Sequence, residues 1–387
     1  MDIYETSFPL CDSNNSGQDD VTFECNGKRV IEMALSLPDD FTLEYQPGDS
    51  LGIIVSNTPQ AVQFILNMLQ DKHGIKPTQK ISIDSNQPVT VEEAVRDFID
   101  LCSPLKNKRI LHSLSQFTTN VQESNALRLL ASKTPDGEEL FKNLVDEQRM
   151  TVVDVLKAFP SCQSIPLEAL IGMLPSIPPR YYSVSSSPLD PRHGALSLTV
   201  AFSVVDYLTP SLQVDGNEIG CRRIGGVATR FLEVLCSGFL SGTMKSPPPT
   251  KLKIFPKPSA DFELPSSLST PLILIGPGTG IAPFIGFLRH RQAQLQQSQQ
   301  TATSMVEGTW RGDYELEADD LPVSNRDAPI VLPQRRLGKI SVFFGCRRSN
   351  HDWLFQEEME KFQQNGIITD LYTAFSREEP KQYVQDV

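Results

Sequence analysis

From residue 271 onward, strand-like and helix-like segments alternate regularly, and this alternation limits the possible folds. Buried-strand patterns in PLILIG, KISVFFG and IITDLYTAF alternate with helical patterns in APFIGFLRHRQAQL and WLFQEEMEKFQQ. Such alternation predicts βαβ units, a parallel sheet, and ligand binding at the carboxyl ends of its strands. We therefore expect a Rossmann-like α/β domain over residues 266–387.

A glycine-rich stretch, GPGTG at residues 276–280, lies between the first strand and the first helix of this domain. Glycines let backbone N–H groups approach a phosphate, and the helix that follows favours an anion at its N-terminus. The stretch lacks the Lys-Ser/Thr ending of a Walker loop and is not a regular GxGxxG fingerprint. Taken alone, it is equally typical of an ordinary strand-to-helix connection.

Polar, basic and aromatic residues follow the last expected strand, where Ser376, Arg377, Lys381 and Tyr383 lie close together in the sequence. Arginine binds a terminal phosphate through two hydrogen bonds, lysine adds a point charge, and tyrosine can stack on an adenine. The cluster predicts a 2′-phosphate site and hence NADPH rather than NADH. The alternative is that the two basic side chains only solvate a loop beside neighbouring glutamates.

The rest of the chain has a different character. Alternating apolar and polar residues over 21–90 and 176–265 predict antiparallel strands, while 91–175 shows helical periodicity, as expected for a helical insertion within a β-domain. We expect residues 1–20 to be a disordered N-terminal segment and the Gln-rich, acidic stretch at about 293–337 to be a disordered insertion.

Two stretches of the β-domain could bind a nucleotide. In RYYSVSSSP, Arg180 could bind a pyrophosphate, Tyr182 could stack on a planar ring, and the Ser183 hydroxyl could hydrogen-bond a ring nitrogen. In GVAT, residues 226–229, small residues open a helix and provide an anion-binding N-terminus. Each stretch alone is more often an ordinary strand or helix start, so their combination carries the prediction.

Composition excludes several classes of function. A net charge of −12 argues against a nucleic-acid-binding surface. The seven cysteines are scattered without CxxC pairs or zinc-ligand spacing, so we expect reduced thiols and no metal site. No apolar run long enough to span a membrane and no signal-peptide pattern is present, which predicts a cytoplasmic protein without a membrane span.

The ordered set RxYS, GVAT, GPGTGxAPF, FGCR and FSR with KxYVQ resembles the FAD/NADPH half of the diflavin reductases, which are relatives of ferredoxin-NADP reductase. The resemblance spans about residues 25–387. It implies an antiparallel FAD-binding β-barrel with an inserted helical connecting domain, followed by the α/β NADPH-binding domain. It also implies that NADPH passes a hydride to FAD, and that electrons then reach FMN and a protein acceptor.

Within the family, AFPSCQ, the GPGTG region and YVQD are most similar to the methionine synthase reductase subfamily. This similarity implies methionine synthase and its cobalamin as the electron acceptor. A reductase of the NADPH-cytochrome type, which delivers electrons to a haem protein, is the alternative.

The resemblance also assigns roles to individual residues. It places Ser183 near the hydride-accepting nitrogen of the flavin and Cys346 near the nicotinamide. The implied FAD-binding residues are Arg149, Arg180, Tyr181, Tyr182, Ser183, Ala201, Phe202, Ser203, Tyr207, Gly226, Val227, Ala228 and Thr229. The implied NADP-binding residues are Gly278, Thr279, Arg347, Ser376, Arg377, Lys381, Tyr383, Val384 and Gln385.

The sequence departs from the family at both ends. The flavodoxin-like FMN domain and the last βα units are missing from this sequence, so we expect a C-terminally incomplete NADPH domain and slow or no hydride transfer. The non-enzymatic alternative is a fragment that binds FAD without transferring hydride.

Overall fold

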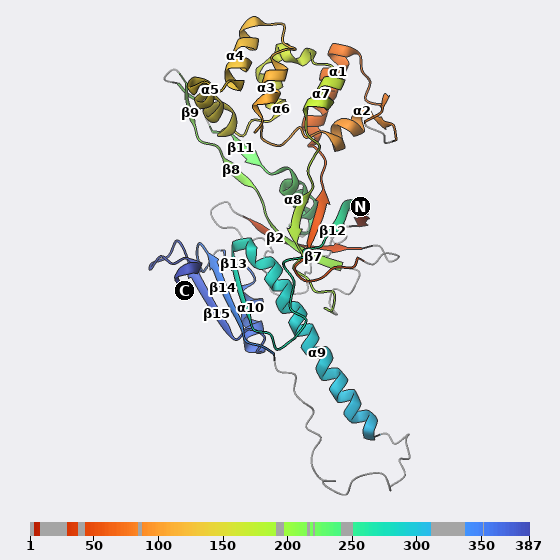
Figure 1. Ribbon diagram of the computed structural model, residues 1–387, viewed down its shortest axis with the longest axis vertical. Coiled ribbons are helices and arrows are strands. Elements are labelled where there is room, and N and C mark those ends of the chain that lie inside the picture. The colour runs from red at the N-terminus through yellow and green to blue at the C-terminus, as the bar shows by residue number, and fades with distance from the viewer. Residues whose placement is uncertain are drawn as a thin grey trace.

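The computed structural model describes residues 4–7, 29–37, 43–83, 87–190, 197–214, 217–219, 221–240, 251–310, 337–350 and 352–387. These residues form three units, seen from top to bottom in Figure 1: a cluster of short helices, an antiparallel sheet, and a parallel sheet with a long helix. None of the described helices is both long enough and apolar enough to cross a membrane.

The central unit is a six-stranded antiparallel sheet with strand order β6-β3-β12-β1-β2-β7. Its inner face packs in a core that includes Ile31, Leu51 and Phe202. Its strands are β1 (Tyr4–Ser7), β2 (Val30–Ser36), β3 (Ser50–Ile54), β6 (Arg180–Ser183), β7 (Ser197–Ser203) and β12 (Lys251–Lys257). Two ribbons and a helix adjoin it: β8 (Asp206–Leu208) with β11 (Arg223–Gly225), β9 (Leu212–Val214) with β10 (Asn217–Ile219), and α8 (Val227–Leu240).

The antiparallel character of this unit agrees with the sequence prediction, but the closed barrel does not appear in the described residues. The two edge strands, β6 and β7, approach each other just beyond β6. There, Val184 and Val200 form an isolated bridge, and the Ser185 N–H donates to the carbonyl of Thr199 at 2.8 Å. The sheet is therefore curved toward closure without a continuous ladder between its edges.

The strand β1 corrects one expectation from the sequence. Residues 1–20 were expected to be disordered, yet Tyr4–Ser7 pairs along its whole length with β12 in the middle of the sheet. Four residues without an apolar alternation do not predict a strand, because their position depends on pairing with a strand distant in the sequence. The remainder of this expected segment lies outside the described residues.

The upper unit contains helices that share one apolar core, with Ile65, Leu69, Leu111, Leu156 and Leu170 fully buried. Its elements are α1 (Pro59–His73), α2 (Val91–Glu93), a π-helical turn Ala94–Phe98, α3 (Lys108–Leu114), α4 (Val121–Ala131), α5 (Pro135–Leu140), a second π-helical turn Phe141–Asp146, α6 (Val152–Ala158), a 3₁₀ turn Pro160–Ser164 and α7 (Leu167–Met173). A small ribbon of β4 (Lys80–Ile81) and β5 (Val89–Thr90) flanks them.

The helical unit starts earlier in the chain than expected. The helix α1 belongs to the helical core, whereas the sequence analysis placed its residues in the β-domain over 21–90 and began the helical insertion at residue 91. Thr58 accepts a hydrogen bond from the Ala61 N–H, Pro59 occupies the first turn, and Gly74 ends the helix in a left-handed conformation with φ +67°. These are ordinary helix start and stop signals.

The lower unit is a three-stranded parallel sheet with strand order β13-β14-β15. The side chains of Leu274, Val342 and Phe344 lie in one core with residues of α9 and α10, so both crossover helices cover the same face. On the opposite face Ile273 and Ile275 are exposed. The elements are β13 (Leu272–Pro277), a 3₁₀ turn Gly278–Ile281, α9 (Ala282–Trp310), β14 (Ile340–Cys346), α10 (Gln356–Gln364), β15 (Asp370–Phe375) and a 3₁₀ turn Val384–Asp386.

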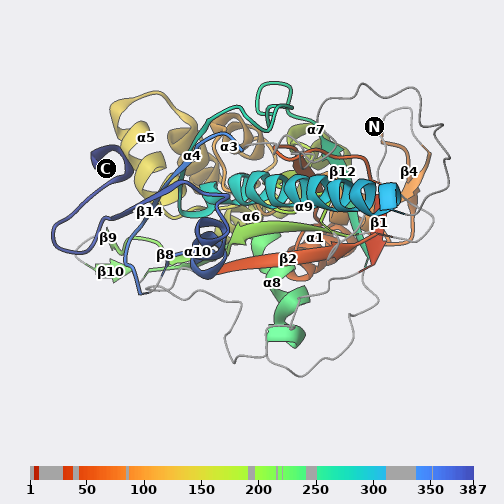
Figure 2. The same ribbon diagram turned by 90° about the horizontal axis from the view of Figure 1, so that it is seen from below.

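The helix α9 corrects a second expectation, because it continues to Trp310 and so includes residues 293–310 of the expected disordered insertion. Its first half packs between the two sheets, and its second half extends away from them (Figures 1 and 2). The Gln and Ala residues of this extension favour a helix even without an apolar period. The rest of the expected insertion lies outside the described residues, apart from Leu337.

The packing of α9 on the antiparallel sheet includes a partly buried histidine. The Nδ1 atom of His290 lies 3.0 Å from the Ser187 hydroxyl oxygen. Burial, and secondarily the charge of Arg291, lowers the pKa of His290 to about 4. Since this value lies below that of an unfolded histidine, about 6.5, the unfolded chain takes up the proton first as the pH falls.

We therefore expect His290 to make the protein less stable in mild acid. Its contribution to the free energy of unfolding is fully present above about pH 6.5 and should fall by about 2 kcal/mol between pH 7 and pH 5. Urea unfolding at both pH values checks this in the wild type and in His290→Asn, which can keep a partner for Ser187 but does not titrate. Equal losses of stability in the two proteins would mean that His290 is not the cause of the lower stability in mild acid.

Candidate functional site

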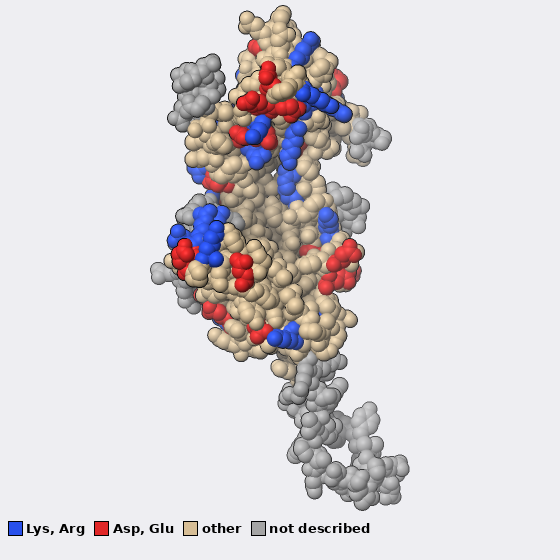
Figure 3. Space-filling model, turned by 60° about the vertical axis from the view of Figure 1, so that its left-hand side comes forward, with Lys and Arg blue, Asp and Glu red and all other residues tan. Residues whose placement is uncertain are grey.

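The first cavity lies between the helical unit and the antiparallel sheet and has a volume of about 430 Å³. Figure 3 shows the molecule hollowed between these units, with Lys and Arg side chains beside the hollow. Residues of the connecting loops, of β6, β8 and β11, and of the start of α8 form its walls. The lining residues are Cys102, Ser103, Pro104, Arg149, Thr151, Arg180, Tyr182, Val205, Tyr207, Arg222, Arg223, Ile224, Gly225, Gly226, Val227, Ala228 and Thr229.

The structure thus brings together most of the residues predicted to bind FAD, although they come from distant parts of the chain. Those in the cavity are Arg149, Arg180, Tyr182, Tyr207, Gly226, Val227, Ala228 and Thr229. The other predicted residues, Tyr181, Ser183, Ala201, Phe202 and Ser203, do not line it.

The start of α8 forms a tight backbone cradle. The Gly226 N–H donates to the Val205 carbonyl at 2.9 Å, and the Thr229 hydroxyl accepts a hydrogen bond from the Val205 N–H at 3.1 Å. A β-carbon on Gly226 would lie 2.8 Å from the Val205 β-carbon and 2.5 Å from the Thr229 hydroxyl oxygen. Only glycine fits this position. The helix N-terminus also supplies N–H groups without intrahelical acceptors, which suits a phosphate.

Guanidinium groups line the same cavity as this cradle, and three of the four pair with carboxylates. Arg149 has a left-handed backbone, with φ +52°, and its Nη1 lies 3.5 Å from an Asp146 carboxylate oxygen. Arg222 donates to Asp154 at 2.9 Å. Such a set of cations fits the pyrophosphate of a flavin dinucleotide better than it fits a neutral ligand.

Several lining residues, including Arg222 and Arg223, were not predicted from the sequence. The sequence signal that could have found them is the pair of arginines shortly before GVAT, at the start of the strand that leads into the cradle. Arg223 also pairs with Asp206 across the ribbon, through its Nε at 2.7 Å. Cys102, Ser103 and Pro104 belong to the helical unit and gave no sequence signal for this cavity.

The adjacent tyrosines of β6 point to opposite sides of the strand, as consecutive residues of a strand must. Tyr182 enters the cavity, and its ring packs edge-on against Phe202 with centroids 5.9 Å apart. Burial raises the pKa of the Tyr182 phenol, so the ring stays neutral and can stack on a planar heterocycle. Tyr181 is instead 47% exposed on the other side, where the Lys257 ammonium lies 3.9 Å from its ring centroid.

The predicted residues of β7 lie behind the cavity. Phe202 is buried in the sheet core and supports Tyr182, while Ala201 is buried on the other face of the strand. Ser203 has a buried hydroxyl that makes no hydrogen bond among the described residues. Ser183 is half-buried and pairs with Ser50, next to Tyr182 in the strand but outside the lining.

The second cavity, of about 290 Å³, lies at the carboxyl ends of the parallel strands. The strand register aligns these ends, because Pro277 lies opposite Gly345 and Cys346 lies opposite Phe375. The lining residues are Pro277, Gly278, Gly345, Cys346, Arg347, Asp352, Ala374, Ser376, Gln382, Tyr383 and Val384.

Among the residues predicted for NADP, the structure gathers those of the strand ends and of the C-terminal turn. Gly278, Arg347, Ser376, Tyr383 and Val384, together with the predicted catalytic Cys346, line the second cavity. Thr279, Arg377, Lys381 and Gln385 do not line it. Asp352 and Gln382 are lining residues that the sequence analysis missed.

Asp352 holds the loop after β14 in place. Its carboxylate accepts hydrogen bonds from the backbone N–H groups of Arg347, at 3.1 Å, and Arg348, at 2.7 Å. Burial, reinforced by Asp352, raises the pKa of the Cys346 thiol to about 12. Cys346 is therefore a neutral thiol at physiological pH and not a thiolate nucleophile.

The basic residues expected to bind the 2′-phosphate lie on the rim beyond this cavity. Arg377 is exposed, and its backbone N–H donates to the Arg347 carbonyl at 2.9 Å, which holds the two loops together. Neither Arg377 nor Lys381 forms an ion pair among the described residues. The carboxylate of Glu378 instead accepts from the N–H and hydroxyl of Ser349, at 2.6 and 2.9 Å.

The fold thus offers two cavities, one beside an antiparallel sheet and the other at the edge of a parallel sheet, as a flavin- and nicotinamide-binding oxidoreductase requires. Residues 18–216 match the FAD binding domain family, and residues 274–387 match the oxidoreductase NAD-binding domain family. These matches confirm the expectation of FAD- and NAD(P)-binding domains.

The curated relatives are diflavin reductases. Human methionine synthase reductase (Homo sapiens) is 31% identical over 386 residues, covering 92% of this chain and 48% of the relative. The mouse protein (Mus musculus) is 30% identical, covering 88% and 46%. Guinea pig (Cavia porcellus) NADPH–cytochrome P450 reductase is 28% identical, covering 92% and 46%.

The chain belongs to the diflavin reductase family, and the family resemblance noted in the sequence is confirmed. It spans about half the length of these curated relatives.

Proposed function

We propose that this chain is the NADPH-oxidising module of a diflavin reductase, with FAD in the first cavity and NADPH in the second. The observation that carries the proposal is the gathering of the predicted FAD residues around Gly226 in one cavity and of the predicted NADP residues around Cys346 in the other. When bound, FAD supplies the capacity to accept a hydride from NADPH.

The residues of the chain would supply binding and orientation. In the first cavity, Arg149, Arg180 and the α8 cradle would hold the pyrophosphate, and Tyr182 would stack on the flavin ring. In the second cavity, the neutral Cys346 thiol would lie beside the nicotinamide, where it adds no negative charge. Arg377 and Lys381 on the rim would bind the 2′-phosphate, which favours NADPH over NADH.

Methionine synthase, with its cobalamin, is the protein acceptor that we propose, with electrons passing through FMN held elsewhere in the intact protein. The support is the subfamily resemblance and the slightly higher identity to methionine synthase reductase, 31%, than to cytochrome P450 reductase, 28%. Because this difference is small, electron delivery to a haem protein is the second candidate, and reduction assays with each acceptor distinguish them.

The test is spectroscopic. We expect the purified chain, reconstituted with FAD, to retain a flavin absorbance band after gel filtration, and we expect NADPH to bleach that band only slowly without oxygen. Folded protein without a band would contradict the flavin site. A band that NADPH does not bleach, although the chain binds NADP⁺, would support the alternative of a binding module that transfers no hydride.

A further inference from the structure

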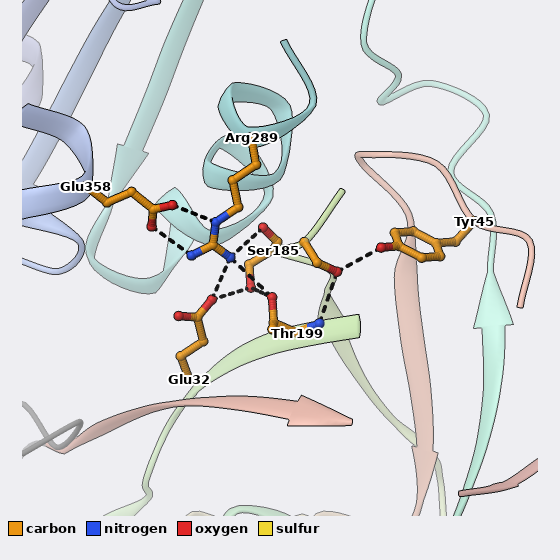
Figure 4. Close-up of polar contacts among 7 residues, drawn as sticks. Glu32, Tyr45, Ser185, Thr199, Arg289 and Glu358 are labelled. Carbon is orange, nitrogen blue, oxygen red and sulfur yellow. Dashed lines mark hydrogen bonds and ion pairs between the residues drawn. The ribbon is translucent and has the colours of Figure 1, made fainter. Parts of the chain in front are cut away.

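One buried guanidinium lies between the antiparallel sheet and the parallel sheet. The Arg289 side chain is only 7% exposed. Its Nε and Nη2 donate to the two carboxylate oxygens of Glu358 at 2.8 and 2.7 Å, in a forked pair. Its Nη1 donates to Glu32 at 2.9 Å, to the Ser185 carbonyl at 3.0 Å, and lies 3.3 Å from the Thr199 hydroxyl oxygen (Figure 4).

These partners come from both nucleotide-binding units. Arg289 and Glu358 belong to α9 and α10, on the parallel sheet, while Glu32 and Thr199 belong to β2 and β7 of the antiparallel sheet. Burial disfavours the charged guanidinium, but the two carboxylates outweigh this effect and keep the pKa of Arg289 above its usual value. The Arg289 guanidinium is therefore charged at physiological pH.

The same face of α9 touches the segment 184–187 at two further positions. A β-carbon on Gly286 would lie 3.0 Å from the Val184 carbonyl oxygen, so the helix backbone approaches this segment closely. One turn later, His290 contacts the hydroxyl of Ser187. Positions 286, 289 and 290 lie on one helical face, because residues three and four apart are neighbours on a helix.

The contacts of α9 connect the surroundings of the two cavities. The segment 184–187 continues directly from β6, whose Tyr182 lines the first cavity. The helix itself follows the turn Gly278–Ile281, whose first residue lines the second cavity. The α-helix spans about 10 Å from Ala282 to Arg289 at about 1.5 Å per residue. The helix is therefore one continuous element between the glycine-rich turn and the segment that follows Tyr182.

We infer that Arg289 is a positioning residue that fixes the nicotinamide-binding unit against the flavin-binding strand, so that occupation of the second cavity alters the flavin environment in the first. The inference rests on the proposed function, because it assumes that the cavities hold these nucleotides. A buried ion pair is weak evidence for stability but can specify one arrangement of the groups around it. Arg289 has such a fixed arrangement, with one carboxylate from each unit.

The experiment compares Arg289→Gln with Lys339→Gln, which removes an exposed cation paired with Asp370 at 2.9 Å, at the other end of the parallel strands. The readout is the change in the flavin absorption spectrum when NADP⁺ is added to the FAD-loaded protein. We expect this difference spectrum to fall at least about fivefold in Arg289→Gln, in line with a coupling free energy of ordinary size. Lys339→Gln should retain it.

Both nucleotide sites should still bind their ligands in Arg289→Gln, which distinguishes a positioning role of Arg289 from the loss of a binding site. FAD content and the affinity for adenosine 2′,5′-bisphosphate, which occupies only the phosphate end of the NADP site, should change less than about twofold. An undiminished difference spectrum in Arg289→Gln would overturn the inference. If that variant does not fold, Glu358→Gln keeps the pair with Glu32, and it should reduce the difference spectrum at least about twofold; no reduction would overturn the inference equally.

A second measurement keeps the inference separate from the proposed function. If the wild-type chain binds no FAD, the proposed function fails, yet calorimetric unfolding without nucleotides still tests the link. The two sheets should then unfold together in the wild type and in Lys339→Gln, and in two separate transitions in Arg289→Gln. A single, unchanged transition in Arg289→Gln would reject the link itself.

Discussion

Replacing Gly226 with valine is expected to weaken flavin binding strongly while the chain stays folded. A β-carbon at this position would lie 2.8 Å from the Val205 β-carbon and 2.5 Å from the Thr229 hydroxyl oxygen, closer than real β-carbons approach. The start of α8 must therefore move away from Val205, which breaks the hydrogen bond between the Val205 N–H and Thr229. Because the cradle would then no longer match the pyrophosphate, we expect the Kd for FAD to rise at least about 100-fold, or about 2.7 kcal/mol.

The measurement is flavin content after reconstitution, together with titration of the apoprotein by fluorescence quenching. The matched control is Gly172→Ala, since Gly172 is exposed and its β-carbon would meet nothing within 4 Å. It should bind FAD like the wild type. Binding of adenosine 2′,5′-bisphosphate shows that the Gly226→Val chain is folded. Wild-type flavin content in that variant would mean that the cradle at the start of α8 does not hold FAD.

The sequence predicted the parts of the site that depend on backbone position. Gly226 and Gly278 lie in turns between a strand and a helix, where close approach of a ligand requires glycine. Arg347 and Ser376 directly follow parallel strands, whose carboxyl ends must meet at one edge of the sheet. Local signals of this kind are sufficient because chain direction and sheet geometry determine where the residues lie.

Residues whose positions depend on tertiary packing were less predictable. Phe202 belongs to a strand behind the cavity, and only the curvature of the sheet shows that Tyr182 shields it. Cys102 reaches the cavity from another unit, which no local pattern indicates. Tyr181 is a different case, because strand alternation alone could have excluded it once Tyr182 was placed in the cavity.

The elements of the fold also divide into those with local sequence signals and those that depend on tertiary contacts. The helix α1 carried its own signals, Thr58, Pro59 and Gly74, yet was assigned to the β-domain because the domain boundary was drawn by composition. The strand β1 carried none, and exists through its pairing with β12. The contacts of Arg289 likewise join residues up to 257 positions apart, so the sequence could not predict the contact between the two sheets.

Arg377 is expected to determine the preference for NADPH over NADH. The 2′-phosphate is the group that distinguishes the two dinucleotides, and Arg377 is an exposed cation beside the second cavity that forms no ion pair among the described residues. A charge-assisted hydrogen bond of arginine to phosphate contributes about 1.5–3 kcal/mol. In Arg377→Ala the Kd for NADP⁺ should therefore rise about 10- to 100-fold, while the Kd for NAD⁺ should change less than about threefold.

Titration calorimetry with both dinucleotides checks this, and Arg348→Ala is the matched control. Arg348 is also exposed and follows β14, as Arg377 follows β15, so its replacement removes the same charge from the same edge of the sheet. If Arg377 acts by direct contact with the 2′-phosphate, Arg348→Ala should weaken NADP⁺ less than about threefold, because a general change in surface potential is screened by salt. Equal losses in the two variants would mean that the edge attracts anions only through its overall charge. Equal losses of NADP⁺ and NAD⁺ in Arg377→Ala would place that side chain at a part of the ligand that both dinucleotides share.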